Sequence, residues 1–208
     1  MSDDLRALKE DLVDHAQRLA ALALAPNTQG NLSVRDAPSG LIVITPHDLP
    51  YETMTVDDVV VVDAWGTVVE GHRETSHETP VHCTVYRECP DIQAVIHSEP
   101  IYVNVFGVLG RPIEPVVITL LLSFGGPVPV MPFMPSGSVD FGMRMLATMG
   151  ECPGVIWGQH GCLTVGRNLD EALRRTVVLE GGAKVAYLAQ QLGTPSVLVP
   201  DDYPLLKG

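Results

Sequence analysis

Basic residues and aromatic rings are both scarce in this sequence. The 208 residues include 13 Lys and Arg against 25 Asp and Glu, so the formal net charge is −12 at pH 7. Nucleic-acid binding requires a basic face, and an anionic membrane surface attracts the same positive charge. Only 5% of the residues are aromatic, which leaves few rings to stack on bases. We therefore expect neither a nucleic acid nor a membrane as a partner.

Long apolar runs and closely paired cysteines are missing as well. No segment is long enough to span a bilayer, and residues 3–20 alternate charges with leucines where a signal peptide would be apolar. The four cysteines form no C-x-x-C pair. Without a signal peptide, cysteines of this kind are usually reduced and buried. These features predict a cytoplasmic protein.

The sequence does contain enough apolar material for one core. Hydrophobic residues make up 46% of the chain and charged residues 18%, as in ordered globular proteins. A chain of 208 residues is long enough for one sizeable core. We expect a single domain over residues 1–208, with an irregular tail rich in Pro and Asp from about residue 195.

Helical and strand patterns follow one another along the chain. Helices are expected at 3–24, 76–88, 102–109, 138–149 and 168–191, and strands at 32–35, 41–45, 59–62, 67–70, 128–131, 155–157 and 163–165, with one more carrying His97. Gly181 and Gly182 lie inside the last helix and cost it roughly 1–2 kcal/mol against alanine, which indicates close packing there. Antiparallel hairpins with helices on both sides indicate an α/β layered domain.

Two histidines, His97 and His160, end apolar runs that lie far apart in the sequence. Glu99 follows His97 by two residues, so on an extended strand both side chains project from the same face. Two histidines and a carboxylate form a divalent-metal set that leaves positions open for a substrate. A single histidine at a strand end is more often a hydrogen-bonded structural residue, so both interpretations stay open at this point. Cys162, two residues after His160, is a conceivable nucleophile.

A second carboxylate, Glu78, lies at a predicted helix start. It follows Thr75 by three residues, which is the spacing of a capping box. A carboxylate at a helix start can equally act as a general base, and the free N–H groups there can bind an anion. Gly30 and Asn31 offer another place for an anion, through close backbone approach and amide donors. His82, one turn after Glu78, is either a fourth ligand, a substrate contact or a partly buried helix residue.

The motifs of this chain, taken together, resemble those of the class II aldolase/adducin family. Five short motifs appear in the family order over residues 5–192: Gly30-Asn31-Leu32-Ser33-Val34-Arg35, Ile44-Thr45-Pro46, Ser76-x-Glu78, Val95-Ile96-His97 and Gln159-His160-Gly161 with Gly166. The resemblance implies a three-layer α-β-α fold with a central, largely antiparallel sheet. It also implies a homotetramer with sites at subunit contacts, and a divalent metal, commonly zinc, that polarises a substrate carbonyl.

The resemblance further implies roles for individual residues. His97 and His160 match two metal histidines of the family, and Glu78 matches its acid/base carboxylate, whose pKa we expect partial desolvation to raise. The family's third metal histidine falls on Glu99, and this change makes iron(II) or manganese credible beside zinc. Part of the family's phosphate-binding cradle is matched by Gly30, Asn31 and Ser76.

The cradle departs from the family pattern at two histidines. His47-Asp48 stand in place of a Ser-Gly pair, and His77 replaces a second cradle serine. A carboxylate beside a phosphate costs energy by like-charge repulsion. We therefore expect His47 and His77 to contact the far end of a small-molecule carbonyl substrate that need not carry a phosphate.

The leading hypothesis is a divalent-metal-dependent lyase that cleaves a C–C bond next to a carbonyl. His97, Glu99 and His160 would hold the metal, and Glu78 would move the proton. Decarboxylation is a close variant, because it uses the same enolate stabilisation. Two further hypotheses keep the fold: a mononuclear iron(II) oxygenase with a two-His-one-carboxylate site, and a non-catalytic scaffold of the adducin type.

Overall fold

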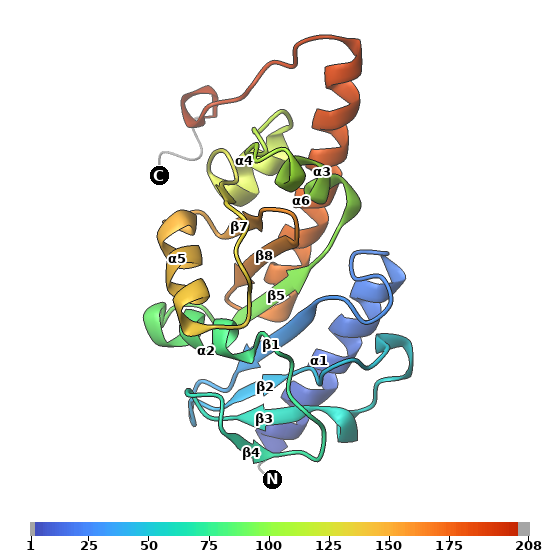
Figure 1. Cartoon of the computed structure of the whole chain (residues 1–208), viewed down its shortest axis with the longest axis vertical. Coiled ribbons are helices and arrows are strands. Elements are labelled where there is room, and N and C mark those ends of the chain that lie inside the picture. Colours follow the sequence, from blue (N-terminus) through green and yellow to red (C-terminus); the bar gives the residue numbers. More distant parts are fainter. Residues whose placement is uncertain (1–2, 204–208) are drawn as a thin grey trace.

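An eight-stranded sheet forms the centre of the computed structural model, which describes residues 3–203 (Figure 1). The strands lie in the order β4-β3-β2-β1-β5-β8-β7-β6, and neighbours are antiparallel except β6 and β7, which are parallel. Their bounds are β1 Asn31–Arg35, β2 Ile42–Ile44, β3 Val60–Val62, β4 Val68–Glu70, β5 Ala94–Ser98, β6 Val130–Met131, β7 Gly154–Trp157 and β8 Gly161–Gly166. The expected largely antiparallel sheet is confirmed.

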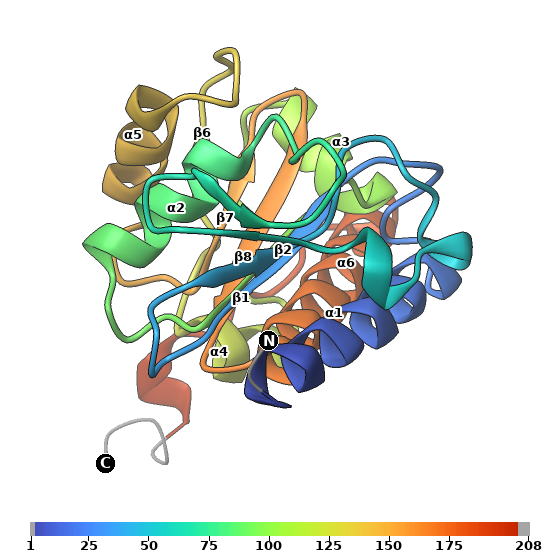
Figure 2. The ribbon, with the colours of Figure 1, turned by 90° about the horizontal axis from the view of Figure 1, so that it is seen from below.

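Helices cover both faces of the sheet and complete three layers (Figure 2). Their bounds are α1 Asp3–Ala21, α2 Thr79–Glu88, α3 Ile101–Val108, α4 Ile118–Phe124, α5 Val139–Met149 and α6 Leu169–Leu192. One apolar cluster joins α1 and the start of α6 to β1, β2 and β5, and a second joins α2 and α5 to the opposite face. A third packs α3 and α4 against α6 and β8. The predicted three-layer α-β-α fold is therefore confirmed.

Side-chain alternation along β1 and β5 decides which face carries polar groups. Leu32 and Ile96 belong to the cluster under α1. Because successive strand residues point to opposite faces, their neighbours Asn31 and His97 point to the side of α2 and α5. The ladder pairs Asn31 directly with His97. A polar pair is thus presented where the α2 layer begins.

The glycine pair in α6 meets two different surroundings. A Cβ atom on Gly182 would lie 2.4 Å from two side-chain atoms of Leu120, whereas a Cβ on Gly181 would meet nothing within 4 Å. The predicted close packing is confirmed for Gly182, because α4 approaches α6 at that position. Gly181 faces outward and has no such contact.

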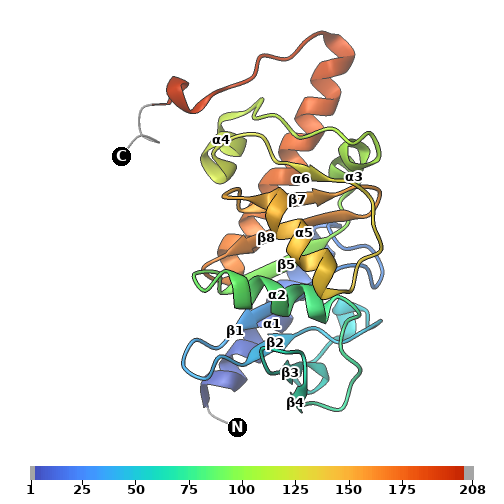
Figure 3. The same cartoon turned by 60° about the vertical axis from the view of Figure 1, so that its left-hand side comes forward.

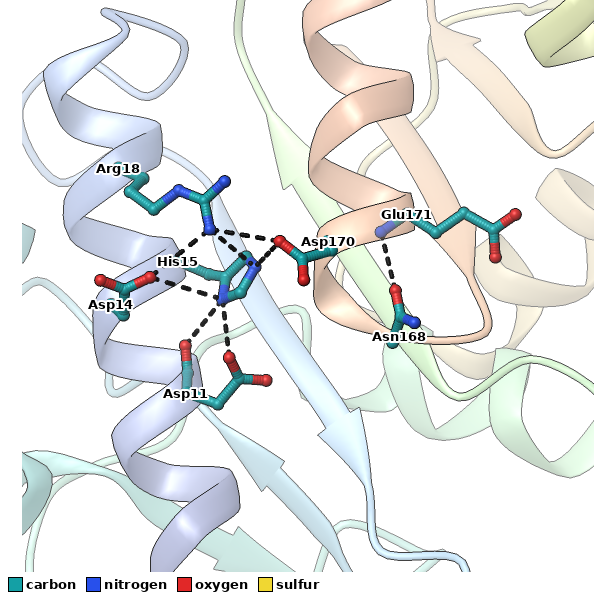
Figure 4. A network of polar contacts seen from close by, with 7 residues as sticks. All are labelled: Asp11, Asp14, His15, Arg18, Asn168, Asp170 and Glu171. Atoms are coloured by element: carbon teal, nitrogen blue, oxygen red, sulfur yellow. Dashed lines mark hydrogen bonds and ion pairs between the residues drawn. The ribbon is translucent and has the colours of Figure 1, made fainter.

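Polar side chains also tie α1 to the start of α6 (Figure 4). The imidazole of His15 is buried, with Nδ1 2.9 Å from the carbonyl oxygen of Asp11 and Nε2 3.1 Å from Oδ1 of Asp170. Arg18 also contacts Asp170, at 3.3 Å. Asn168 caps the start of α6, since its side chain accepts a 2.8 Å bond from the N–H of Glu171. These contacts fix the two helices that cover one face of the sheet.

After α6 the chain turns back past α4, while α2 and α5 lie in front of the sheet in the view of Figure 3. The N–H of Leu198 donates to the carbonyl of Pro115, and the one regular element of the described tail is a 3-10 turn at Pro200–Asp202. Among residues 3–203, no helix is both long and apolar enough to cross a membrane. The single-domain assignment over 1–208 stays a prediction, and its first two and last five residues lie outside the described part.

Candidate metal centre

A pocket of about 250 Å³ lies where β5 ends and α2 begins. Its lining includes the nine residues predicted to hold the metal, transfer the proton or bind the substrate, namely Gly30, Asn31, His47, Ser76, His77, Glu78, His97, Glu99 and His160. A larger open groove of about 690 Å³ runs beside α1, but its lining is mainly apolar. The chemistry of the side chains, not the size of the cavity, therefore selects the smaller pocket as the candidate site.

Two imidazoles and a carboxylate converge in this pocket. Oε2 of Glu78 lies 3.3 Å from Nε2 of His97, and Oε1 of Glu78 lies 3.6 Å from Nε2 of His160. The ligand atoms of these three residues all lie within 4.8 Å of one another. Imidazole nitrogen and carboxylate oxygen are ligands that zinc, iron and manganese accept. The cluster is therefore a potential site for a divalent cation.

The ring of His97 is held in the tautomer that a metal ligand needs. Its Nδ1 lies 2.9 Å from the carbonyl oxygen of Cys162, which only accepts, so Nδ1 carries the hydrogen. Nε2 is then the ring nitrogen that faces the cluster, which is the arrangement usual for metal-bound histidines. Trp157 stacks on the ring at a centroid distance of 4.3 Å and fixes its plane. The donor set therefore fits a bound cation.

Glu78 is held by neutral donors on both carboxylate oxygens. Asn31 donates to Oε2 at 2.9 Å, and the hydroxyl of Ser136 donates to Oε1 at 2.7 Å. Burial by itself would raise the pKa of Glu78, but the ring of His97 and the two donors outweigh it and lower the pKa to about 2. The expectation of a raised pKa was wrong, because it counted desolvation and omitted these partners.

The capping box predicted for Glu78 is not formed. Glu78 itself occupies the N-cap position of α2 and makes no side-chain capping bond there. Its N–H instead donates to the hydroxyl of Ser76 at 3.2 Å. The carboxylate is thereby free to turn into the pocket. No pattern in the sequence indicated Ser136, because it lies in an irregular loop 58 positions further along the chain.

Glu99 lies beside the cluster and not on the strand that carries His97. The strand β5 ends at Ser98, and the N–H of Glu99 donates to the carbonyl of Leu24, outside the sheet ladder. Its Oε1 atom lies 3.8 Å from Nε2 of His160, and burial raises the pKa of its carboxyl group. A part of the prediction is thus corrected: Glu99 reaches the pocket from a loop. Its role as a metal ligand stays a prediction.

Gly30 lets the loop before β1 approach β5 closely. Its φ is +86°, and a Cβ atom there would lie 2.6 Å from the carbonyl oxygen of His97. Both features exclude a side chain at this position. Gly30 therefore brings backbone, and the neighbouring amide of Asn31, against the histidine end of the pocket.

Two further histidines line the pocket, one from the loop after β2 and one from the loop before α2. His47 and His77 stack with ring centroids 4.1 Å apart and an interplanar angle of 23°. Nε2 of His77 lies 4.0 Å from a carboxylate oxygen of Glu74, and both side chains are exposed. Asp48 lies next to them in the lining. This part of the pocket thus combines two titratable rings with negative charge.

The conceivable roles of Cys162 and His82 find no support in the geometry. Cys162 is buried, and burial raises the pKa of its thiol to about 12. His82 is buried too, and both of its ring nitrogens are hydrogen-bonded, one to Asn31 and one to Ser33. A thiol with such a pKa is a poor nucleophile at neutral pH. His82 has no ring nitrogen left for a cation.

The three-layer fold and the histidine–carboxylate cluster place this chain in the class II aldolase and adducin group of proteins. The sequence matches the family described as Class II Aldolase and Adducin N-terminal domain over residues 10–187, and the chain belongs to this family. The resemblance inferred from the motifs is confirmed. Enzymes of this class depend on a divalent metal, which agrees with the donor set found in the pocket.

Similar proteins include enzymes of two kinds. The L-ribulose-5-phosphate 4-epimerase UlaF of Salmonella paratyphi C is 32% identical over 214 residues, which cover 98% of this chain and 93% of the relative. A solved L-fuculose 1-phosphate aldolase superposes with a TM-score of 0.91 at 30% identity, covering 99% of this chain and 95% of that one. YgbL from Escherichia coli, described as a putative aldolase/epimerase/decarboxylase, has a TM-score of 0.86 at 22% identity, with coverages of 98% and 99%, and shares the fold.

Proposed function

We propose that this chain is a divalent-metal-dependent lyase that cleaves a C–C bond next to a carbonyl by an aldolase-type reaction. The observation that supports it most is the convergence of Glu78 with His97 and His160 at the end of β5. A carboxylate that touches both candidate ligands is well suited to transfer a proton at the carbon that reacts beside the cation.

The roles of the residues follow from the chemistry of cleavage. A hydroxyl oxygen loses its proton and becomes a carbonyl as the C–C bond breaks, and the electron pair of that bond forms an enolate that then takes up a proton. His97, His160 and Glu99 would hold a divalent cation, zinc in our proposal, which would supply positive charge to stabilise an enolate oxygen. We assign both proton transfers to Glu78: its ionised carboxylate takes up the hydroxyl proton and then gives a proton to the enolate carbon. Its two neutral donors orient the carboxylate and keep it ionised until the reaction.

An epimerase reaction is a second candidate, favoured by the relatives named L-ribulose-5-phosphate 4-epimerase. It needs the same cleavage, followed by re-addition of the enolate to the opposite face of the aldehyde. The cation site would stabilise the same enolate, while Glu78 would take the hydroxyl proton during cleavage and return it to the new hydroxyl after re-addition. The two candidates differ in whether the aldehyde fragment leaves the pocket.

We propose that the far end of the substrate meets Gly30, Asn31, Ser76, His47 and His77. The backbone and amide donors near Gly30 suit an anionic or hydroxylated group, while Asp48 disfavours a dianionic phosphate close by. The stacked imidazoles can donate to hydroxyl or carboxylate oxygens. A substrate without a phosphate is therefore our proposal, and the phosphorylated sugars serve as the comparison.

We propose that four copies of this chain form a homotetramer, as the resemblance to the family implies. Apolar side chains on α3, α4 and α6 are exposed in the single chain, including Ile101, Leu122 and Leu188. Contact between copies would remove this surface from water. Sedimentation velocity at several protein concentrations measures the state directly, and a monomer throughout would contradict the tetramer.

The experiment that tests the function begins with metal analysis of protein purified without added metal. The protein is then loaded with zinc, manganese or iron(II) under anaerobic conditions and assayed with L-fuculose 1-phosphate, L-ribulose 5-phosphate and both unphosphorylated sugars. We expect metal-dependent release of an aldehyde without oxygen consumption. Interconversion of epimers without release would favour the epimerase. Turnover only with iron(II) and oxygen would identify an oxygenase, release of carbon dioxide from an added 3-keto acid a decarboxylase, and absence of bound metal a scaffold.

A further inference from the structure

A chain of hydrogen bonds leads from Glu78 into the interior. Asn31 Nδ2 lies 2.9 Å from Glu78 Oε2, and Asn31 Oδ1 lies 2.6 Å from Nε2 of His82. Nδ1 of His82 lies 2.6 Å from the hydroxyl of Ser33, which lies 2.8 Å from the hydroxyl of Tyr86. Four hydrogen bonds in sequence thus link five side chains.

Every hydrogen in this chain points towards Glu78. The amide oxygen of Asn31 only accepts, so Nε2 of His82 must carry a hydrogen. Burial lowers the pKa of His82 to about 3, so the ring is neutral and its Nδ1 accepts. Ser33 therefore donates to that nitrogen, and its oxygen is left to accept from Tyr86. Each group has one possible orientation.

This series of hydrogen bonds forms because same-face side chains of β1 and same-face side chains of α2 follow one another at nearly the same spacing. Alternate residues of β1 are separated by about 6.8 Å, and residues four apart on α2 by about 6 Å. Positions 31, 33 and 35 of the strand therefore stay level with positions 78, 82 and 86 along α2. At the far end, the guanidinium of Arg35 lies 5.3 Å from the centre of the Tyr86 ring and donates to the Tyr86 carbonyl.

The inner residues of this hydrogen-bonded series are buried away from water. Ser33 and His82 are fully buried, and Tyr86 and Asn31 are 3% and 5% exposed. An unsatisfied polar group at such depth is costly, and hydrogen bonds that point one way strengthen each other in a medium of low dielectric. Loss of any one of these hydrogen bonds would therefore weaken the others, including the bond between Asn31 and Glu78. Packing alone does not explain five polar side chains inside an apolar layer, because apolar side chains would fill the same space without the cost of desolvation.

We propose that Tyr86, Ser33 and His82 are positioning residues for the reaction, which hold the carboxylate of Glu78 at the histidine cluster through Asn31. This inference rests on the proposed role of Glu78. The single side-chain amide of Asn31 donates its N–H to Glu78, and its oxygen accepts from His82. The inner three residues fix that orientation by offering a donor, and never an acceptor, to the amide oxygen.

Kinetics of conservative variants test the proposal. Ser33→Ala and His82→Leu should lower kcat about 10–100-fold while KM changes less than about threefold, since loss of groups that orient a catalytic residue has effects of this size. Tyr86→Phe should act less strongly, because it removes the most distant link. His82→Gln should restore most of the lost kcat, since its amide can donate to Asn31 and accept from Ser33. Thr84→Val is the matched control, because Thr84 is buried on the same helix and bonds to Pro80 and Arg87.

Nuclear magnetic resonance tests the same inference without substrate or turnover. The ring nitrogens of His82 should show a neutral ring with hydrogen on Nε2, and the carboxyl carbon of Glu78 should shift in Ser33→Ala but not in Thr84→Val. Hydrogen on Nδ1, an unmoved Glu78 signal, or full kcat in folded Ser33→Ala would overturn the proposal. A wild-type protein without lyase or epimerase turnover that still shows these signals would refute the proposed function and leave the positioning chain standing.

Discussion

Asn31 on β1 is the direct ladder partner of His97 on β5. Paired residues in an antiparallel ladder share one face of the sheet. The amide of the first and the ring of the second therefore meet the same carboxylate oxygen of Glu78, at 2.9 Å and 3.3 Å. The register of two neighbouring strands thus fixes the surroundings of the carboxylate that we assign to proton transfer.

Replacement of Glu78 by glutamine should abolish turnover. Glu78→Gln keeps the shape and the bonding capacity of the side chain but removes the group that carries the proton. We expect kcat to fall by about 10²–10⁴-fold, the usual contribution of general acid–base catalysis. Bound metal should stay at the wild-type stoichiometry. A variant with more than a tenth of the wild-type kcat would contradict the role of Glu78.

Removal of the Glu99 carboxylate should release the metal without unfolding the chain. Glu99→Ala takes away one of the three proposed ligands, and metal content measured by mass spectrometry after dialysis should fall well below that of the wild type. Glu88→Ala, which removes an exposed acid at the far end of α2, is the control. Full metal occupancy in Glu99→Ala together with loss in Glu78→Gln would assign the third ligand to Glu78.

The two glycines of α6 should respond oppositely to alanine. Gly182→Ala brings a Cβ to 2.4 Å from Leu120, and such overpacking costs about 1–3 kcal/mol. Gly181→Ala adds its Cβ in open space and should stabilise the helix by up to about 1 kcal/mol. Urea denaturation of the pair measures both effects under identical conditions. Equal midpoints would show that α4 yields to the added methyl group.

Acid should remove a contribution to stability that Asp58 makes at neutral pH. Hydrogen bonds from Thr55, aided by Arg73 at 2.7 Å, lower the pKa of Asp58 to about 2. A carboxyl with a lowered folded-state pKa stabilises the fold above its unfolded pKa of about 3.9, and the contribution disappears as the pH falls towards 2. Asp58→Asn should therefore cost about 1–2 kcal/mol at pH 7 and little at pH 2. The neighbouring exposed Asp57→Asn should cost little at either pH, and a pH-independent loss in Asp58→Asn would contradict this account.

Local patterns predicted every strand and five of the six α-helices of the described part, because each depends on neighbours in the sequence, whereas α4 was not predicted as a helix. The cap at Asn168, the turn between β1 and β2 and the strand ending near His97 all follow from residues within a few positions. The extension of that strand to Glu99 was wrong, since the chain leaves the ladder at Ser98 to bond with Leu24. Whether a strand continues depends on a partner that the local pattern does not contain.

The sequence by itself determined the family, the order of the strands and of the helices other than α4, and the polar residues that gather in the pocket other than Ser136. Only the tertiary structure decided that Glu78 turns between His97 and His160, that Ser136 and Asn31 hold it, and that its pKa falls instead of rising. Periodicity tells which side of an element a residue faces, but the electrostatic environment of a carboxylate depends on distances to groups 47 and 58 positions away in the chain. Those distances exist only once β1, α2 and the loop before α5 have packed together.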